Sequence, residues 1–298
     1  MPDEAYAHTN SLRLHYVEWP QAGAPTAIFL HATGFLGRLW QPIAQELARD
    51  WRVLALDQRG HGDSDKPGLS SAEGPPGAYA WPNFVHDLIA FLDGLNLASV
   101  LAVGHSLGGA AITYAASLRP DLIGRAVLIE PIVFSPEVRA GGGDDYHARL
   151  IESSRRRRIL WPSREELYRS YRDRSPFDTW QDDVLRLYVE YGTFPQKDGQ
   201  VELKCPGEIE AQVFEGQPTL DVFAVLPQVR CPTLILYGQR TEDHLADAAQ
   251  AAAARIPDAR LVSIPEASHF LPMERPDAVV QEVRKFLRET DSGPSPCP

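Results

Sequence analysis

A serine between glycines, Ser106 in the G-x-S-x-G run 104–108, is the feature of this sequence that points most directly to chemistry. It follows a short apolar run, residues 100–103, and precedes a helix-compatible run, residues 110–118. In that context the pattern predicts a sharp strand-to-helix turn that exposes the serine hydroxyl as a nucleophile. The N–H groups and the positive dipole end of the helix would stabilise an oxyanion that forms there. The alternative is a glycine-rich turn in which Ser106 only caps the helix.

The elements that must position this turn are predicted by the apolar pattern of the chain. Stretches with apolar residues three and four positions apart, such as 84–95, predict amphipathic helices. They alternate with short runs rich in Val, Ile and Leu, which predict strands buried on both faces, at 27–30, 53–56, 100–103, 126–129, 234–237 and 261–264. This alternation predicts an α/β fold with a mostly parallel central sheet flanked by helices, entered by an extended segment at 12–19.

The strand pattern stops between about residues 132 and 218, where we expect an inserted helical cap over a site. The predicted organisation is a core formed by residues 1–131 and 219–290, a cap at 132–218 and a frayed tail at 291–298. The run Arg155 to Arg158 could recognise an anionic substrate or carrier, but a solvated helix surface is the simpler interpretation. Large apolar side chains of the cap could line a pocket, although each alone is more often core: Trp161, Tyr168, Tyr171, Phe177, Trp180, Leu187, Tyr188, Tyr191 and Phe194.

Composition limits the classes of partner. The chain has 298 residues, 44% of them hydrophobic, which is enough to build a core without disulfides or a structural metal. Its 29 basic and 40 acidic residues give a net charge of −11, which argues against nucleic acid and anionic membranes, so we expect a small-molecule substrate and a monomer or homodimer. Three cysteines without metal-like spacing, an acidic start and the lack of a long apolar run favour the cytoplasm.

Several segments resemble the α/β-hydrolase fold superfamily, and their order and spacing match it across nearly the whole chain. The segments that carry the resemblance are residues 30–35 (LHATGF), 56–65 (LDQRGHGDSD), 104–109 (GHSLGG) and 267–271 (ASHFL). The cap is the part without a recognisable motif, and in this superfamily it is the most variable part and selects the substrate. The resemblance implies a serine hydrolase branch with a helical cap and a catalytic triad in which Ser106 is the nucleophile.

The resemblance assigns the general base to His269, in the loop that follows the run 261–264. Such a partner is needed because a serine hydroxyl is a weak nucleophile near neutral pH. An imidazole with an ordinary pKa of about 6.5 can take the proton and return it to the leaving group. Other histidines fit this role less well, and we expect His31, His61 and His105 to form local hydrogen bonds or to pack.

An oxyanion hole is also implied by the resemblance. The first donor is the backbone N–H of Leu107, the residue after the nucleophile. The second donor is expected at Thr33, in the loop after the first central strand. Ala32 and Gly34 are alternatives, because this chain has His31-Ala32 where His-Gly is usual.

The acid of the triad departs from the common pattern. Most members place it after the strand that corresponds to 234–237, where this chain has Thr241, which cannot orient an imidazole by charge. Glu130, which directly follows the predicted strand 126–129, is the preferred candidate, since certain haloalkane dehalogenases move the acid to the end of that strand. A carboxylate there would lie at the strand ends where ligands bind in open α/β sheets. Glu242 or Asp243 is the competing candidate.

A serine nucleophile with a histidine base suits acyl transfer, in which an ester, thioester or lactone acylates Ser106 and water releases the acid. The sequence therefore predicts hydrolysis of a carboxylic ester of a small, largely apolar molecule, with no metal or organic cofactor. Hydrolysis of C–C bonds and peroxyacid formation use similar residues and are alternatives. Dehalogenases and epoxide hydrolases that form an alkyl-enzyme ester need Asp as nucleophile, so Ser106 argues against them. A non-catalytic ligand-binding protein on the same fold is the alternative of another class.

Overall fold

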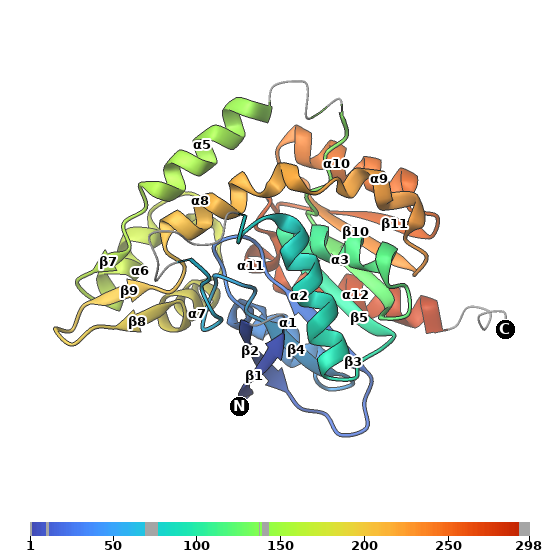
Figure 1. Cartoon of the computed structure of the whole chain (residues 1–298), viewed down its shortest axis with the longest axis horizontal. Coiled ribbons are helices and arrows are strands. Elements are labelled where there is room, and N and C mark those ends of the chain that lie inside the picture. The colour runs from blue at the N-terminus through green and yellow to red at the C-terminus, as the bar shows by residue number, and fades with distance from the viewer. Residues whose placement is uncertain (1, 10–11, 69–76, 137, 139–142, 292–298) are drawn as a thin grey trace.

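An eight-stranded sheet forms the centre of the molecule, with the strand order β1-β2-β4-β3-β5-β6-β10-β11 (Figure 1). The computed structural model describes residues 2–9, 12–68, 77–136, 138 and 143–291. The first two strands pair antiparallel, β2 pairs antiparallel with β4, and the remaining neighbours pair parallel. The predicted α/β fold with a mostly parallel central sheet is confirmed. The strands are β1 (Asp3–Thr9), β2 (Leu12–Trp19), β3 (Thr26–Leu30), β4 (Arg52–Leu56), β5 (Val100–His105), β6 (Ile123–Ile129), β10 (Thr233–Gly238) and β11 (Ala259–Ile264).

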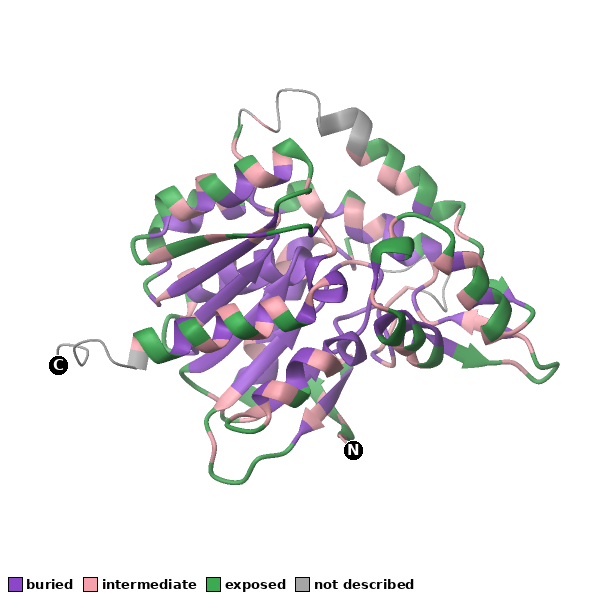
Figure 2. Cartoon of the chain, turned by 180° about the vertical axis from the view of Figure 1, so that it is seen from behind, coloured by how far each residue is buried: buried purple, intermediate pink, exposed green. Residues whose placement is uncertain are grey.

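Helices cover both faces of this sheet, which explains why its central strands are continuous apolar runs (Figure 2). On one face lie α2 (Trp81–Gly94), α3 (Leu107–Leu118) and α10 (Asp243–Arg255). On the other face lie α1 (Gln41–Leu47) and α12 (Pro276–Asp291). Each fully buried Leu, Ile or Phe contributes roughly 1.5–3 kcal/mol of transfer free energy. These apolar contacts hold the strand ends, and the loops that leave them, in fixed positions.

Two strands differ from the prediction. The run 261–264 was expected to be buried on both faces, and this is wrong. Among the described strands, β11 pairs with β10 alone and forms the edge of the sheet, so several of its side chains, including Leu261, are exposed. The strand β1 was not predicted, because its residues are mostly polar and exposed and it is held by its pairing with β2.

Between β6 and β10, the described residues add no strand to the central sheet. Helices form much of this segment, as expected, but it also contains a three-stranded antiparallel sheet with the order β7-β9-β8, which was not predicted. Its strands have two or three residues each, too short to give a pattern. The elements of the segment are α5 (Gly143–Arg155), β7 (Leu160–Trp161), α6 (Arg164–Arg172), η2 (Phe177–Thr179), α7 (Asp182–Tyr191), β8 (Thr193–Pro195), β9 (Val201–Leu203), α8 (Gly207–Glu215) and η3 (Gln217–Thr219).

An aromatic cluster joins the segment between β6 and β10, called the cap segment below, to the core. Trp180 meets Phe35, from the loop after β3, edge to face at a centroid distance of 5.2 Å, and it lies 6.1 Å from Phe270. Phe177 and Tyr188 pack against the same indole. Because Phe270 follows His269 in the chain, this cluster ties the cap to the loop that carries the predicted base.

Short helical turns complete the core: η1 (Gly37–Trp40), α9 (Val222–Val225), η4 (Leu226–Gln228) and α11 (Leu271–Glu274). In the described ranges, no helix is both long and apolar enough to cross a membrane. Cys205 and Cys231 are buried free thiols. The predicted tail lies outside the described residues from 292 onward, and Cys297 lies there too.

Candidate active site

Ser106 lies in the turn between β5 and α3, with φ of 54° and ψ of −113°. Such a conformation costs a residue with a side chain about 1–3 kcal/mol, so the surroundings must hold it. The Ser106 N–H donates to the carbonyl of Ile129 at 2.9 Å, which anchors the turn to β6. Glycine is required on both sides. A Cβ on Gly108 would lie 2.4 Å from the carbonyl oxygen of Leu30, and one on Gly104 would lie 2.5 Å from the backbone of Gly108.

One cavity of about 1090 Å³ is lined by both Ser106 and His269. The core also contributes Thr33 and Phe35, and the cap segment contributes much of the remaining wall. Of the aromatic residues predicted to line a pocket, the cavity is lined by Trp161, Tyr171 and Phe177. Trp180 and Tyr188 do not line the cavity, but they share with Trp161, Tyr171 and Phe177 the buried cluster between cap and core.

His269 is oriented by a buried carboxylate. Its Nδ1 lies 3.2 Å from Oε2 of Glu130, which follows directly on β6 and has a side chain with 0% exposure. The Glu130 carboxylate also accepts the N–H of Gly238 at 2.6 Å and the hydroxyl of Thr241 at 2.9 Å. These donors fix the position of the carboxylate against the imidazole of His269.

The order of the strands explains how a carboxylate that follows β6 can reach His269. The end of this strand lies beside the end of β10, with Ile129 paired to Leu236 and the N–H of Glu130 donating to the Leu236 carbonyl at 2.8 Å. A side chain that leaves either strand end therefore reaches the same edge of the sheet. Thr241, which takes the position where an acid was expected, lies against Glu130 and donates a hydrogen bond to it.

The competing acids lie elsewhere. Glu242 and Asp243 are exposed at the start of α10, whereas Glu130 contacts the ring of His269. The geometry therefore brings Ser106, His269 and Glu130 to one site. The contribution of Thr241 was missed, because the sequence indicated only that it could not supply a charge. The adjacency of β6 and β10 was the signal that could have revealed it.

His105, inside the serine turn, holds the backbone of the loop with the base. Its Nε2 donates to the carbonyl of His269 at 2.8 Å. Burial, together with the nearby His269 ring, keeps the pKa of His105 well below its usual value. The ring is thus a neutral donor, in agreement with the local hydrogen-bonding role that we expected.

Two further buried histidines shape the loop after β3. Nε2 of His61 accepts the N–H of Gly34 at 3.0 Å, and Nε2 of His31 accepts the N–H of Gln58 at 3.0 Å. Burial and the neighbouring His31 lower the pKa of His61 to about 3. Burial also lowers the pKa of His31. Both rings remain neutral, since only a neutral imidazole offers an acceptor nitrogen.

These contacts narrow the choice of oxyanion donors. The N–H of Gly34 is already used by His61, so Thr33 and Ala32, which both line the cavity, are better placed as the second donor. Leu107 is the first residue of α3, where backbone N–H groups have no partner within the helix. The loop and the helix start thus both offer donors near Ser106.

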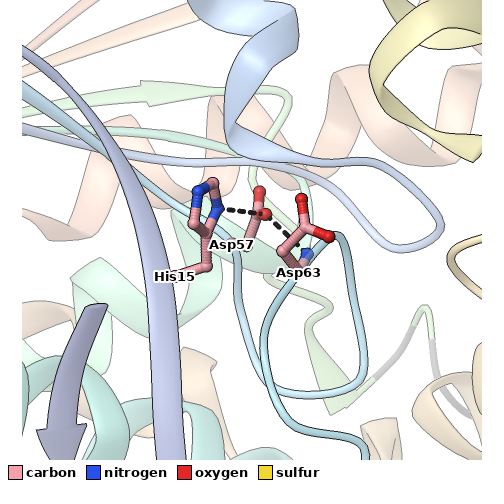
Figure 3. Close-up of side chains that lie close together, drawn as sticks. All are labelled: His15, Asp57 and Asp63. Atoms are coloured by element: carbon pink, nitrogen blue, oxygen red, sulfur yellow. Dashed lines mark hydrogen bonds and ion pairs between the residues drawn. The ribbon is translucent and has the colours of Figure 1, made fainter. Parts of the chain in front are cut away.

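A second cluster of ionisable side chains, His15, Asp57 and Asp63, has ligand atoms within 4.8 Å of one another (Figure 3). The Asp57 carboxylate is already engaged by the N–H of Gly37 at 2.6 Å, the N–H of Asp63 at 2.9 Å and Nδ1 of His15 at 2.8 Å. Burial opposes charge on His15, but the hydrogen bond to Asp57 and the negative charges of Asp57, Asp63 and Glu4 together outweigh burial and raise the pKa of His15.

The other carboxylate of this cluster, Asp63, pairs with Lys204 of the cap. The hydrogen bonds of the cluster therefore join β2 to the loop after β4, and the ion pair joins that loop to the cap. These contacts suit a structural cluster better than a metal centre.

The chain belongs to the Alpha/beta hydrolase family, whose model matches residues 27–282. It is 26% identical to epoxide hydrolase 4 of Mus musculus, over 94% of this chain and 77% of that protein. It is also 26% identical to 2-(acetamidomethylene)succinate hydrolase of Mesorhizobium japonicum, over 90% of this chain and 89% of that protein. A crystal structure of E-2-(acetamidomethylene)succinate hydrolase matches with a TM-score of 0.81 and 24% identity, over 97% of this chain and 100% of the other. These relatives are hydrolases, and hydrolysis is the class of activity that this fold and its relatives support.

Proposed function

We propose that this protein is a serine hydrolase that cleaves a carboxylic ester, thioester or lactone of a small molecule through an acyl-enzyme on Ser106. The observation that carries the proposal is that Ser106 and His269 line one cavity while Nδ1 of His269 lies 3.2 Å from the buried carboxylate of Glu130. That contact engages Nδ1, so Nε2 is the nitrogen that would accept the serine proton.

In the proposed reaction, His269 removes the proton of Ser106 as its oxygen attacks the substrate carbonyl. Glu130 stabilises the imidazolium that forms, and the N–H groups of Leu107 and Thr33 bind the oxyanion. Collapse of the tetrahedral intermediate breaks the bond to the leaving group, which takes the proton from His269. A water molecule, activated by the same imidazole, then attacks the acyl-enzyme and releases the acid with Ser106 restored.

The nucleophile argues against epoxide or alkyl halide hydrolysis here, although one similar protein is named an epoxide hydrolase. Attack by Ser106 on such a carbon would form a seryl ether. An ether has no carbonyl for water to attack, so the enzyme would not turn over. An acyl-serine keeps its carbonyl and can be hydrolysed, which favours acyl substrates.

Steady-state hydrolysis of 4-nitrophenyl esters of graded acyl length tests this proposal. We expect turnover by the wild type, and a decrease in kcat/KM of at least about 1000-fold in Ser106→Ala and in His269→Gln. Circular dichroism would verify that both variants fold. Equal activity in Ser106→Ala would contradict the proposal. A folded wild type that binds these esters without turnover would favour the ligand-binding alternative.

A further inference from the structure

The wall of the cavity carries more positive than negative side chains. Among the residues that the structure describes, four arginines line it, against one carboxylate, Glu210. The whole chain has a net charge of −11, so this wall reverses the overall sign of the protein. The arginines are Arg156, Arg157, Arg158 and Arg174.

Two of these arginines have no acidic partner in the described part of the chain. Arg156 forms an ion pair with Glu152, and Arg157 with Glu210 at 2.8 Å. Among the ion pairs of residues 2–9, 12–68, 77–136, 138 and 143–291, none includes Arg158 or Arg174. Both residues are exposed and both line the cavity, so their charges are available to a ligand.

Arg158 is held in place before any ligand arrives. Its Nε donates to the carbonyl of Leu160 at 2.8 Å, and its guanidinium lies 4.5 Å from the ring centre of Trp161. The hydrogen bond uses Nε and leaves the terminal nitrogens to face a partner. A guanidinium fixed in this way loses less conformational entropy when it binds an anion.

Arg157 and Arg174 act on the same neighbour. Burial raises the pKa of the Tyr171 hydroxyl, and the charges of Arg157 and Arg174 oppose that rise. The N–H of Arg174 donates to the carbonyl of Tyr171 at 3.0 Å, and Tyr171, Arg157 and Arg174 all line the cavity. Arg157 is partly buried and is bonded through Nη2 to Glu210.

The arginine run divides between the cavity and the outer surface. Arg155 does not line the cavity but bonds to Glu208 and Glu215 of α8. Its three successors line the cavity wall. The expectation of a mostly solvated run fits Arg155, Arg156 and Arg158, which are exposed, but only Arg155 belongs to α5, and the three arginines after it line the cavity.

We propose that Arg157, Arg158 and Arg174 form a subsite for a carboxylate of the substrate, which would make the substrate a half-ester of a dicarboxylic acid. The reaction at the other end of such a molecule rests on the proposed function, whereas the binding step does not. Guanidinium groups suit this role because they bind a carboxylate by paired, charge-assisted hydrogen bonds.

Matched esters test the subsite. The probes are the monomethyl esters of succinate, glutarate and adipate, each compared with its neutral dimethyl ester at neutral pH. We expect the best monomethyl ester to exceed its dimethyl partner in kcat/KM by roughly tenfold or more, mainly through KM. Arg158→Gln and Arg174→Gln should each reduce this ratio by roughly tenfold. The matched control, Arg155→Gln, removes the same charge from the same run and should keep the wild-type ratio.

Binding to Ser106→Ala, measured by calorimetry, separates the subsite from the chemistry. If the monomethyl esters bind Ser106→Ala more tightly than the dimethyl esters, and Arg174→Gln abolishes the difference, the subsite stands even when the wild type fails to hydrolyse either set. Hydrolysis of both sets with equal kcat/KM would overturn the subsite and leave the proposed function intact. An equal decrease in Arg155→Gln and Arg174→Gln would also overturn it. Acetyl-coenzyme A, a thioester that carries phosphate groups, is a further probe. If it alone is turned over and its turnover depends on Arg174, the arginines bind the phosphates of such a carrier and the carboxylate subsite is wrong.

Discussion

The hydroxyl of Thr241 donates a 2.9 Å hydrogen bond to Oε2 of Glu130, the same oxygen that lies 3.2 Å from Nδ1 of His269. Thr241, at the position where an acid was expected, therefore holds in place the carboxylate that follows the neighbouring strand β6. Glu130 sits at a positive φ of 49°, in a backbone conformation that is costly for a residue with a side chain. Two strand ends thus cooperate in orienting one imidazole.

Glu130→Gln should lower kcat of ester hydrolysis far more than Asp243→Asn. The amide cannot stabilise an imidazolium and can donate to Nδ1, which favours the wrong tautomer of His269. We expect a decrease of about 100- to 10,000-fold for Glu130→Gln and little change for Asp243→Asn, which alters an exposed residue at the start of α10. Steady-state kinetics on folded proteins decide the matter, and the opposite ranking would exclude Glu130 as the acid.

A carboxylate placed at residue 241, after the neighbouring strand β10, should restore part of the activity that Glu130→Gln loses. Because the Thr241 side chain already contacts Glu130, an aspartate there would lie near His269. We expect the double variant Glu130→Gln/Thr241→Asp to exceed Glu130→Gln in kcat by roughly tenfold or more. Thr241→Asp alone serves as the control and should lose activity, since it sets two carboxylates side by side. If the double variant is no more active than Glu130→Gln, the two strand ends are not interchangeable.

The backbone conformation of Ser106 should lower the free energy of unfolding of the protein. Glycine adopts the φ of 54° at position 106 without strain, whereas alanine does not. Ser106→Gly should therefore unfold with a free energy about 1 kcal/mol higher than Ser106→Ala, while both variants lack the nucleophile. Urea denaturation followed by circular dichroism measures the difference. An alanine variant as stable as the glycine variant would show that the turn is not strained.

His61 should make the fold sensitive to acid. Its pKa falls from 6.5 to about 3 on folding, so below pH 6.5 the unfolded chain binds the proton first. Its contribution is fully present above pH 6.5 and is lost as the pH falls, by up to roughly 1.4 kcal/mol per pH unit. His61→Gln should reduce the slope of unfolding free energy against pH between about pH 6 and about pH 5 by about one proton. An unchanged slope in urea titrations would mean that His61 titrates normally in the folded protein.

The sequence was most informative where one short segment carries the whole signal. The buried strands and the glycines around Ser106 are local patterns, and the fold and turn followed from them. The contact of Thr241 with Glu130 depends on β6 and β10 lying side by side, although they are far apart in the chain. The division of the arginine run likewise depends on packing against α8. The prediction for β11 failed for a similar reason. Its apolar residues suggested burial on both faces, but it lies at the edge of the sheet, where several of its side chains are exposed.

The most direct test of the account is the intact mass of the protein after treatment with a fluorophosphonate, for the wild type and for Ser106→Ala. This reagent labels a serine that is activated by its base and oxyanion hole. We predict a single adduct on the wild type, its loss in Ser106→Ala, and much slower labelling in Glu130→Gln. A folded wild type without an adduct, or an adduct that persists in Ser106→Ala, would contradict the assignment of Ser106 as an activated nucleophile.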